Sequence, residues 1–255
     1  MAASSPAVAQ APPTAPTSAV QEATESAQAE ALLMRMAEHL GKATSFSVTL
    51  NVTYDVVQQS GEKVEFGEVR HILLNRPNDL RIDVDGRDGS RQEIRFDGKT
   101  MTMFTPGSPF FASLEHPGSV DDILFYIADG LQTPIPLSLL LVTTVAQELE
   151  RRIDEIDLVD NETLDGKEVD HLAVRTDEVD FQVWVAKGEL PVPLRVVISY
   201  KKAPGQPQFA ANLSDWNFAP KIDMSAFTFV PPAGERPIPF MVRVAARPKM
   251  PKAGR

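Results

Sequence analysis

Alternation of apolar and polar residues dominates the chain between residues 180 and 232. Phe181, Val183 and Val185 alternate with other side chains, and the same two-residue period returns twice after Gly- and Pro-containing turns. Residues 227–229 predict a further short strand. Period-two alternation bounded by Gly and Pro is typical of antiparallel strands that bury one face. This part of the chain therefore predicts a meander of strands.

The first half of the chain follows the same pattern after one helix. An apolar stripe predicts a helix over residues 30–40, and Gly41 ends it as a C-cap. Short turns such as Asp97-Gly98 then separate alternating runs, as expected for hairpins. These runs predict strands over residues 45–55, 64–76, 80–85, 94–96 and 101–103.

Residues 106–152 interrupt the alternation. The segment 106–117 reads as an apolar loop rich in Pro and Gly. Ser119 is a good N-cap for a short helix over residues 121–131, and Asp122 completes a capping box. A second helix is predicted over residues 137–152, and its first half is apolar nearly all round. A helix start of this kind is expected to lie buried under the sheet.

These elements predict a mainly β protein with helices, of the α+β class. We expect about ten strands in one large curved antiparallel sheet, with the helices packed on its concave face. Residues 29–240 form the single predicted domain. The composition of residues 1–28 predicts a disordered leader, and the composition of residues 241–255 predicts a basic disordered tail.

The leader has two interpretations. The run Ala7-Val8-Ala9-Gln10 resembles the small-residue end of a secretory signal peptide, although the basic and apolar regions of such a signal are missing. It is either the remnant of an incomplete signal peptide, which predicts export, or a plain low-complexity leader.

Charge and cysteine content narrow the choice of partners. The net charge of −10 disfavours nucleic acid, because an acidic protein repels phosphate backbones. The basic tail either touches an anionic membrane or is simply solvated. The chain has no cysteine, which excludes disulfides, thiolate metal sites and a cysteine-linked lipid anchor. No apolar run reaches the ~18 residues that a transmembrane helix needs.

No pattern of catalytic or metal-binding residues stands out in the sequence. The four histidines lack the spacing of a metal site. Nucleophile-elbow, P-loop and dinucleotide-binding motifs are missing as well. The acidic run at residues 83–88 fits a hairpin turn better than a calcium loop. We therefore predict no enzyme activity, no cofactor and no metal. Trp184 and Trp216 either stack on a ligand or pack within the fold.

The interruption carries more apolar surface than short connecting elements usually need. These side chains either fill the concave side as a solid core or line a cavity for an apolar ligand, and flexible methionines suit the second reading. In both cases we expect them to face the concave side of the sheet. The candidate lining residues are Met101, Met103, Phe110, Phe111, Phe125, Leu139 and Leu140.

The C-terminal motifs resemble a known family. DFQVWVAKG (180–188), PLRVVISYK (193–201), PQF (207–209), LSDWNF (213–218) and FTFVPPAG (227–234) are similar to the predicted periplasmic proteins of domain of unknown function 2092. The resemblance runs from about residue 30 to residue 240. That family is more distantly similar to the LolA/LolB lipoprotein carriers and to the sensor domain of RseB.

The resemblance implies an unclosed β-barrel with a helical lid over an apolar cavity that takes acyl chains. The expected protein is a non-enzymatic, exported, periplasmic monomer that binds a lipid or the acyl group of a lipoprotein. The alternative is an interaction or sensor module that binds another envelope protein and has no ligand cavity. Such carriers also use an arginine to latch the lid, and strand position makes Arg70 and Arg81 the inward-facing candidates.

Overall fold

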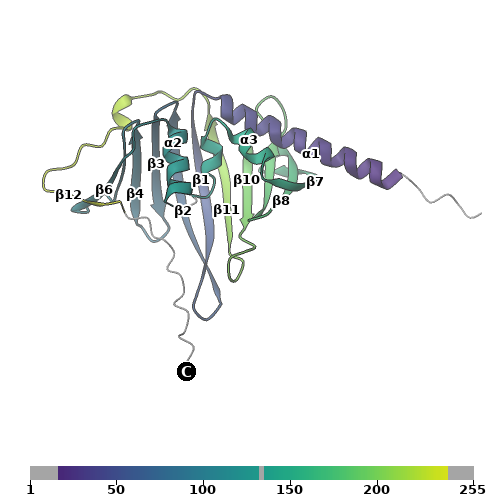
Figure 1. The fold of residues 1–255 in the computed structure, drawn as a ribbon, viewed down its shortest axis with the longest axis horizontal. Coiled ribbons are helices and arrows are strands. Elements are labelled where there is room, and N and C mark those ends of the chain that lie inside the picture. The colour runs from purple at the N-terminus through teal and green to yellow at the C-terminus, as the bar shows by residue number, and fades with distance from the viewer. Residues whose placement is uncertain (1–16, 132–134, 241–255) are drawn as a thin grey trace, which may run out of the picture.

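A single twisted sheet with helices on one side forms the fold (Figure 1). The structure is a computed structural model that describes residues 17–131 and 135–240. The helical elements are α1 (Thr17–Lys42), α2 (Val120–Phe125), the π-helical turn η1 (Tyr126–Gly130), the 3-10 helix η2 (Ser138–Leu141), α3 (Val145–Glu150) and the 3-10 helix η3 (Met224–Ala226).

The sheet contains 12 strands in the order β12-β6-β5-β4-β3-β2-β1-β11-β10-β9-β8-β7. The strands are β1 (Ser45–Val57), β2 (Lys63–Asn75), β3 (Asp79–Gly86), β4 (Arg91–Asp97), β5 (Thr100–Phe104), β6 (Phe110–Glu115), β7 (Ile153–Leu164), β8 (Lys167–Thr176), β9 (Asp180–Ala186), β10 (Pro193–Ser199), β11 (Gln208–Asn217) and β12 (Arg236–Pro239). Neighbouring strands are antiparallel except β12 and β6, which run parallel.

Strand β1 joins the two meanders, because it pairs with β2 on one side and with β11 on the other. Its apolar residues Phe46, Val48, Leu50 and Val52 are buried, as strand alternation requires. We call the face that carries them the inner face and the opposite one the outer face. Helices α1, α2, η1, η2 and α3 cover the inner face (Figure 1).

The predicted fold class is confirmed. The sheet is large and almost wholly antiparallel, and it stays open, with β7 and β12 as its two edges. Helix α1 lies over the β7 end, where it contacts β7, β8 and β9. Strand β7 is acidic and carries two register shifts, both of which discourage pairing with another chain.

Helix α1 begins earlier than its apolar stripe predicts. It starts at Thr17 rather than near residue 30, so it takes in residues 17–28 of the predicted disordered leader. Residues 17–28 are rich in Ala, Gln and Glu, which are strong helix formers, and they contain no proline, since the last proline before them is Pro16. The low content of large apolar residues led to the wrong boundary. The remainder of the leader, with the signal-like run, lies outside the described residues.

The interruption is less helical than predicted. Residues 106–117 are not a loop throughout, because Phe110–Glu115 forms β6. The predicted helix over 137–152 is two short helices, η2 and α3. Leu137 adopts a left-handed conformation (φ 66°), and the extended backbone at Val142 separates η2 from α3. The predicted helix over 121–131 is confirmed as α2 followed by η1.

Residues 227–229 do not form the predicted strand. They cross the outer face of the sheet, where Phe229 packs on Phe104 and Phe111. Alternating phenylalanines here reflect contact with a side-chain layer rather than pairing in a ladder. The chain then adds β12 beside β6, which the proline-rich sequence did not predict.

The predicted capping box at α2 is present. The Asp122 backbone N–H donates to Ser119 Oγ (3.2 Å), and the Asp122 carboxylate accepts from the Ser119 backbone N–H and hydroxyl (2.7 Å each). These hydrogen bonds from the backbone and then the side chain of Ser119 lower the pKa of Asp122.

Replacing Ser119 by alanine removes the cap of α2. We expect Ser119→Ala to lower the free energy of unfolding by about 1 kcal/mol and to raise the pKa of Asp122. Urea unfolding and an NMR titration of the Asp122 carboxyl measure the two effects. Ser214→Ala, at an exposed site on β11, is the control and should change stability by less than ~0.5 kcal/mol. Equal losses in both variants would contradict the cap.

Candidate functional site

Half-buried apolar side chains border the core on the sheet and on the helices of residues 120–150, and we call this set of side chains the seam. We call α2, η1, η2 and α3 the helical insertion. The deepest contacts are fully packed, since Phe46, Phe96 and Ile123 have no exposed surface. Around this core, large apolar residues on both sides are only partly covered. They are Ile82, Ile94 and Met103 on the sheet, and Phe125, Ile135, Leu137, Leu139 and Leu140 on the insertion or its connections.

The predicted lining residues are divided between the two faces. Met101 is buried on the inner face at 3% exposure, and Met103 follows it there in β5. Phe125, Leu139 and Leu140 pack against the core from the insertion.

Phe110 and Phe111 are neighbours in β6, so they point to opposite faces. Phe110 lies on the inner face, is 40% exposed and is covered by the guanidinium of Arg236 at 5.2 Å. Phe111 pairs with Phe104 and packs on Phe229 on the outer face. The expectation that all these residues face the helices is therefore wrong for Phe111, because its segment forms a strand.

Arg76 joins α1, the sheet and the helical insertion. Its Nη1 donates to the carbonyls of Leu40 (2.8 Å), Gly41 (3.3 Å) and Ala43, and its Nη2 donates to the carbonyl of Leu141 (2.9 Å). The C-terminal carbonyls of a helix have no partner within the helix, and a cation is favoured beside them. Burial lowers the pKa of Arg76, and the charge of Asp121 opposes this shift.

A second set of hydrogen bonds connects the two halves of the insertion. The Asp121 carboxylate, in the first turn of α2, accepts from the backbone N–H of Thr143 at 2.9 and 3.1 Å and from its hydroxyl. Asp121 and Arg76 thus fasten the insertion at residues 141–143. Neither residue could be found from spacing, because each contacts partners far away in the sequence.

The two arginines named in the sequence analysis lie on opposite faces. Arg70 faces inward, since it pairs with Leu50 and lies over the ring of Phe209 at 5.6 Å. Its Nε donates to Glu68 (2.5 Å), and both side chains are largely buried, at 18% and 16% exposure. Arg81 lies on the outer face, where it pairs with Asp83 at 2.9 Å. In this structure Arg76, rather than either of them, contacts the insertion.

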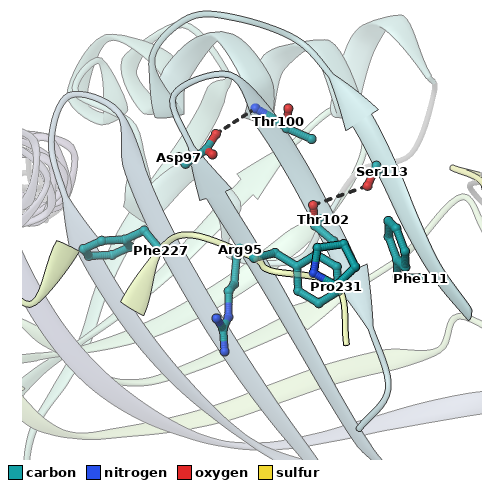
Figure 2. A pocket seen from close by; sticks show the side chains of 9 residues that line it. Arg95, Asp97, Thr100, Thr102, Phe111, Ser113, Phe227 and Pro231 are labelled. Atoms are coloured by element: carbon teal, nitrogen blue, oxygen red, sulfur yellow. Dashed lines mark hydrogen bonds between the residues drawn. The ribbon is translucent and has the colours of Figure 1, made fainter. Parts of the chain in front are cut away.

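A small pocket lies on the outer face under residues 227–231 (Figure 2). Its volume is about 200 Å³. Thr102 and Ser113 meet at its floor with their hydroxyl oxygens 3.4 Å apart, and Arg95 donates to the Thr228 carbonyl at 2.8 Å. The lining residues are Arg95, Asp97, Thr100, Thr102, Phe111, Ser113, Phe227, Phe229 and Pro231.

Both tryptophans are packed by protein neighbours. Trp184 stacks on His171 at 4.0 Å on the outer face, and its Nε1 donates to Glu162. Trp216 packs on Phe46 at 5.4 Å on the inner face. Within residues 17–131 and 135–240, no group of three or more His, Cys, Asp or Glu side chains is arranged to hold a metal ion. No helix in the described part of the chain is long and apolar enough to cross a membrane.

The solved structures similar to this chain include two mycobacterial proteins. LprF from Mycobacterium bovis is 14% identical, with 78% of this chain and 96% of that chain covered and a TM-score of 0.50. The lipoprotein LppX from Mycobacterium tuberculosis is 14% identical, with 77% and 99% covered and a TM-score of 0.48. A LolA superfamily protein from Nitrosomonas europaea is 12% identical, with 79% and 97% covered and a TM-score of 0.38.

At 14% identity, the likeness to LprF shows similarity of fold alone. No curated protein sequence matches the chain. A family model matches most of the described part of the chain, from the middle of α1 to the end of β12, and describes its members as predicted periplasmic proteins. With a match over residues 29–241, the chain belongs to the DUF2092 family of predicted periplasmic proteins.

Proposed function

We propose that this protein is a non-enzymatic periplasmic binding protein that holds an acyl chain in the seam between the inner face and the helical insertion. The insertion acts as the lid. The half-buried apolar side chains on both sides of the seam carry the proposal. Burying a large apolar side chain completely gains roughly 1.5–3 kcal/mol. An acyl chain inserted along the seam would cover the apolar surface that these side chains still expose, and would gain the remaining part of this free energy.

The chemistry of the seam supports binding rather than catalysis. Ile82, Ile94, Phe125 and Leu140 offer no acid, base or nucleophile, and Met103 contributes only a thioether. Aliphatic and thioether groups adapt to flexible apolar ligands. The hydrogen bonds of Arg76 and Asp121 hold one end of the insertion, near residues 141–143. Movement of the remaining part would open the seam.

Lipid uptake by the purified full chain tests this function. We expect native mass spectrometry after gentle purification to show a co-purified lipid, and a fluorescent fatty acid to bind saturably with one molecule per chain. A clean protein mass, together with no uptake of the fatty acid, would overturn the proposal.

Binding of an envelope protein is the second candidate function. The favouring observation is an exposed apolar patch at the end of the β1–β2 hairpin. Val56 pairs with Val64 there, and these side chains are 40% and 42% exposed. Phe66 beside them is 47% exposed. An apolar patch of this kind is typical of interaction surfaces. Absence of lipid uptake would favour this candidate.

A further inference from the structure

Polar donors gather at one end of the apolar inner face. Arg70, Tyr54 and Tyr200 lie there among the rings of Phe66 and Phe209. Tyr54 stacks on Phe66 at 6.0 Å, and Tyr200 follows directly after β10 and packs against the core. The Arg70 side chain is only 18% exposed among these rings, and its position calls for an explanation because removing a charged group from water is costly.

Strand register brings the three side chains together. Phe209, which lies under Arg70, pairs with Tyr54 in β1 and with Ile198 in β10, two residues before Tyr200. Burial raises the pKa of Tyr54, and the charge of Glu68 adds to the rise while that of Arg70 opposes it. Burial likewise raises the pKa of Tyr200, against the charge of Arg70. Arg70 thus lies near both phenols by register, and its charge contributes to the pKa of each.

These donor groups can form further hydrogen bonds. Among the described residues, the only hydrogen bond of the Arg70 side chain is the one from Nε to Glu68, so the terminal Nη1 and Nη2 groups have no partner. The hydroxyls of Tyr54 and Tyr200 make no hydrogen bond to a described residue either. A guanidinium and two phenols can all donate to an oxyanion, and the arginine fork matches a carboxylate or phosphate.

We infer that this end of the inner face binds the anionic head group of an amphiphile whose acyl chain lies in the seam. The inference rests on the proposed function and adds the class of ligand. Arg70 donates through its terminal nitrogens, and the two phenols donate beside it. Phe66 and Phe209 cover the first carbons of the chain. The oxyanion is either the carboxylate of a fatty acid or the phosphate of a lysophospholipid.

Glu68 sets the charge of the site. Its carboxylate accepts from Nε of Arg70 and neutralises the guanidinium charge. It therefore holds the arginine in place when the site is empty, and it weakens attraction for an anion. Glu68→Gln keeps an acceptor for Nε and removes the negative charge, so this variant should bind anionic amphiphiles several-fold more tightly.

Three ligands of equal chain length test the inference on the full chain. Displacement of a neutral fluorescent acyl probe gives the Kd of oleate, oleoyl lysophosphatidate and oleyl alcohol. We expect at least one of the two anions to bind about tenfold more tightly than the alcohol, equivalent to about 1.4 kcal/mol. Arg70→Met should abolish this preference, since methionine cannot donate to an oxyanion. The preferred anion identifies the source of the head group.

Two further variants keep the test decisive. Arg81→Met removes an outer-face arginine and should preserve the preference for anions. Tyr200→Phe, which removes one donor without changing charge, should weaken anion binding by two- to fivefold even if Arg70→Met does not fold. Equal binding of all three ligands to the wild type would overturn the head-group site and leave the acyl-binding function standing. Failure of all three to bind would instead overturn the acyl-binding function itself.

Discussion

Replacing Arg76 by methionine is expected to lower the free energy of unfolding by about 3 kcal/mol. Hydrogen bonds from a charged group contribute roughly 1.5–3 kcal/mol each, and a buried carbonyl that loses its donor adds a desolvation cost. The substitution leaves the carbonyl of Leu141 and those at the end of α1 without their donor. The estimate stays below a simple sum because Nε of Arg76 is itself buried in the wild type and has no partner among the residues that the structure describes.

Thermal and urea unfolding measure this effect. For a domain of this size, 3 kcal/mol corresponds to a fall in Tm of roughly 6–12 °C. Arg76→Lys keeps the charge but loses the planar fork, so it should recover only part of the stability. Arg81→Met removes a half-exposed ion pair and should cost less than ~1 kcal/mol. A Tm for Arg76→Met equal to that of Arg81→Met would show that the junction contributes little.

Replacing Leu140 by tryptophan is expected to abolish uptake of a fatty acid. Leu140 lies on η2, half-buried against the core, in the seam where the acyl chain is proposed to lie. A larger ring there occupies the space of the ligand. Overpacking should cost about 1–3 kcal/mol of stability. Leu140→Ala should bind ligand and lose less than the ~2–5 kcal/mol of a fully buried leucine.

Fluorescence titration with a fatty acid, combined with thermal melts with and without ligand, measures both variants. Leu190→Trp is the matched control, because Leu190 is 56% exposed in the turn between β9 and β10 and faces no seam. This control should bind like the wild type. If Leu140→Trp also binds normally, the acyl chain does not pass η2, and the position of the proposed site is wrong.

Local sequence determined the strands and their faces. The alternation from Phe46 to Tyr54 defined β1 and its buried side, since a two-residue period leaves only one face apolar. Ser119 and Asp122 fixed the start of α2, because a capping box is complete within four residues. The family followed from motifs on contiguous stretches, and the match over residues 29–241 confirmed it.

Tertiary contacts decided what such patterns cannot encode. The face of Phe111 depended on the pairing of β6 with β5, and the loop-like sequence around it did not reveal that pairing. Residues 227–229 alternate like a strand, yet they pack across side chains of the outer face. Alternation records which side chains are buried, and it does not say whether a backbone ladder or another surface buries them.

The sequence predicted one part of the candidate site, and tertiary contacts decided the other. The sequence predicted an apolar insertion over a sheet, because surplus apolar residues need a surface to cover. It did not predict that Arg76 would fasten this insertion to α1, or that Arg70 would reach Tyr54 and Tyr200. These side chains come from strands and connections distant in the chain. Only the register of β1, β2, β10 and β11 brings Arg70, Tyr54 and Tyr200 to one end of the inner face, because hydrogen-bonded pairing fixes which residues are neighbours across a sheet.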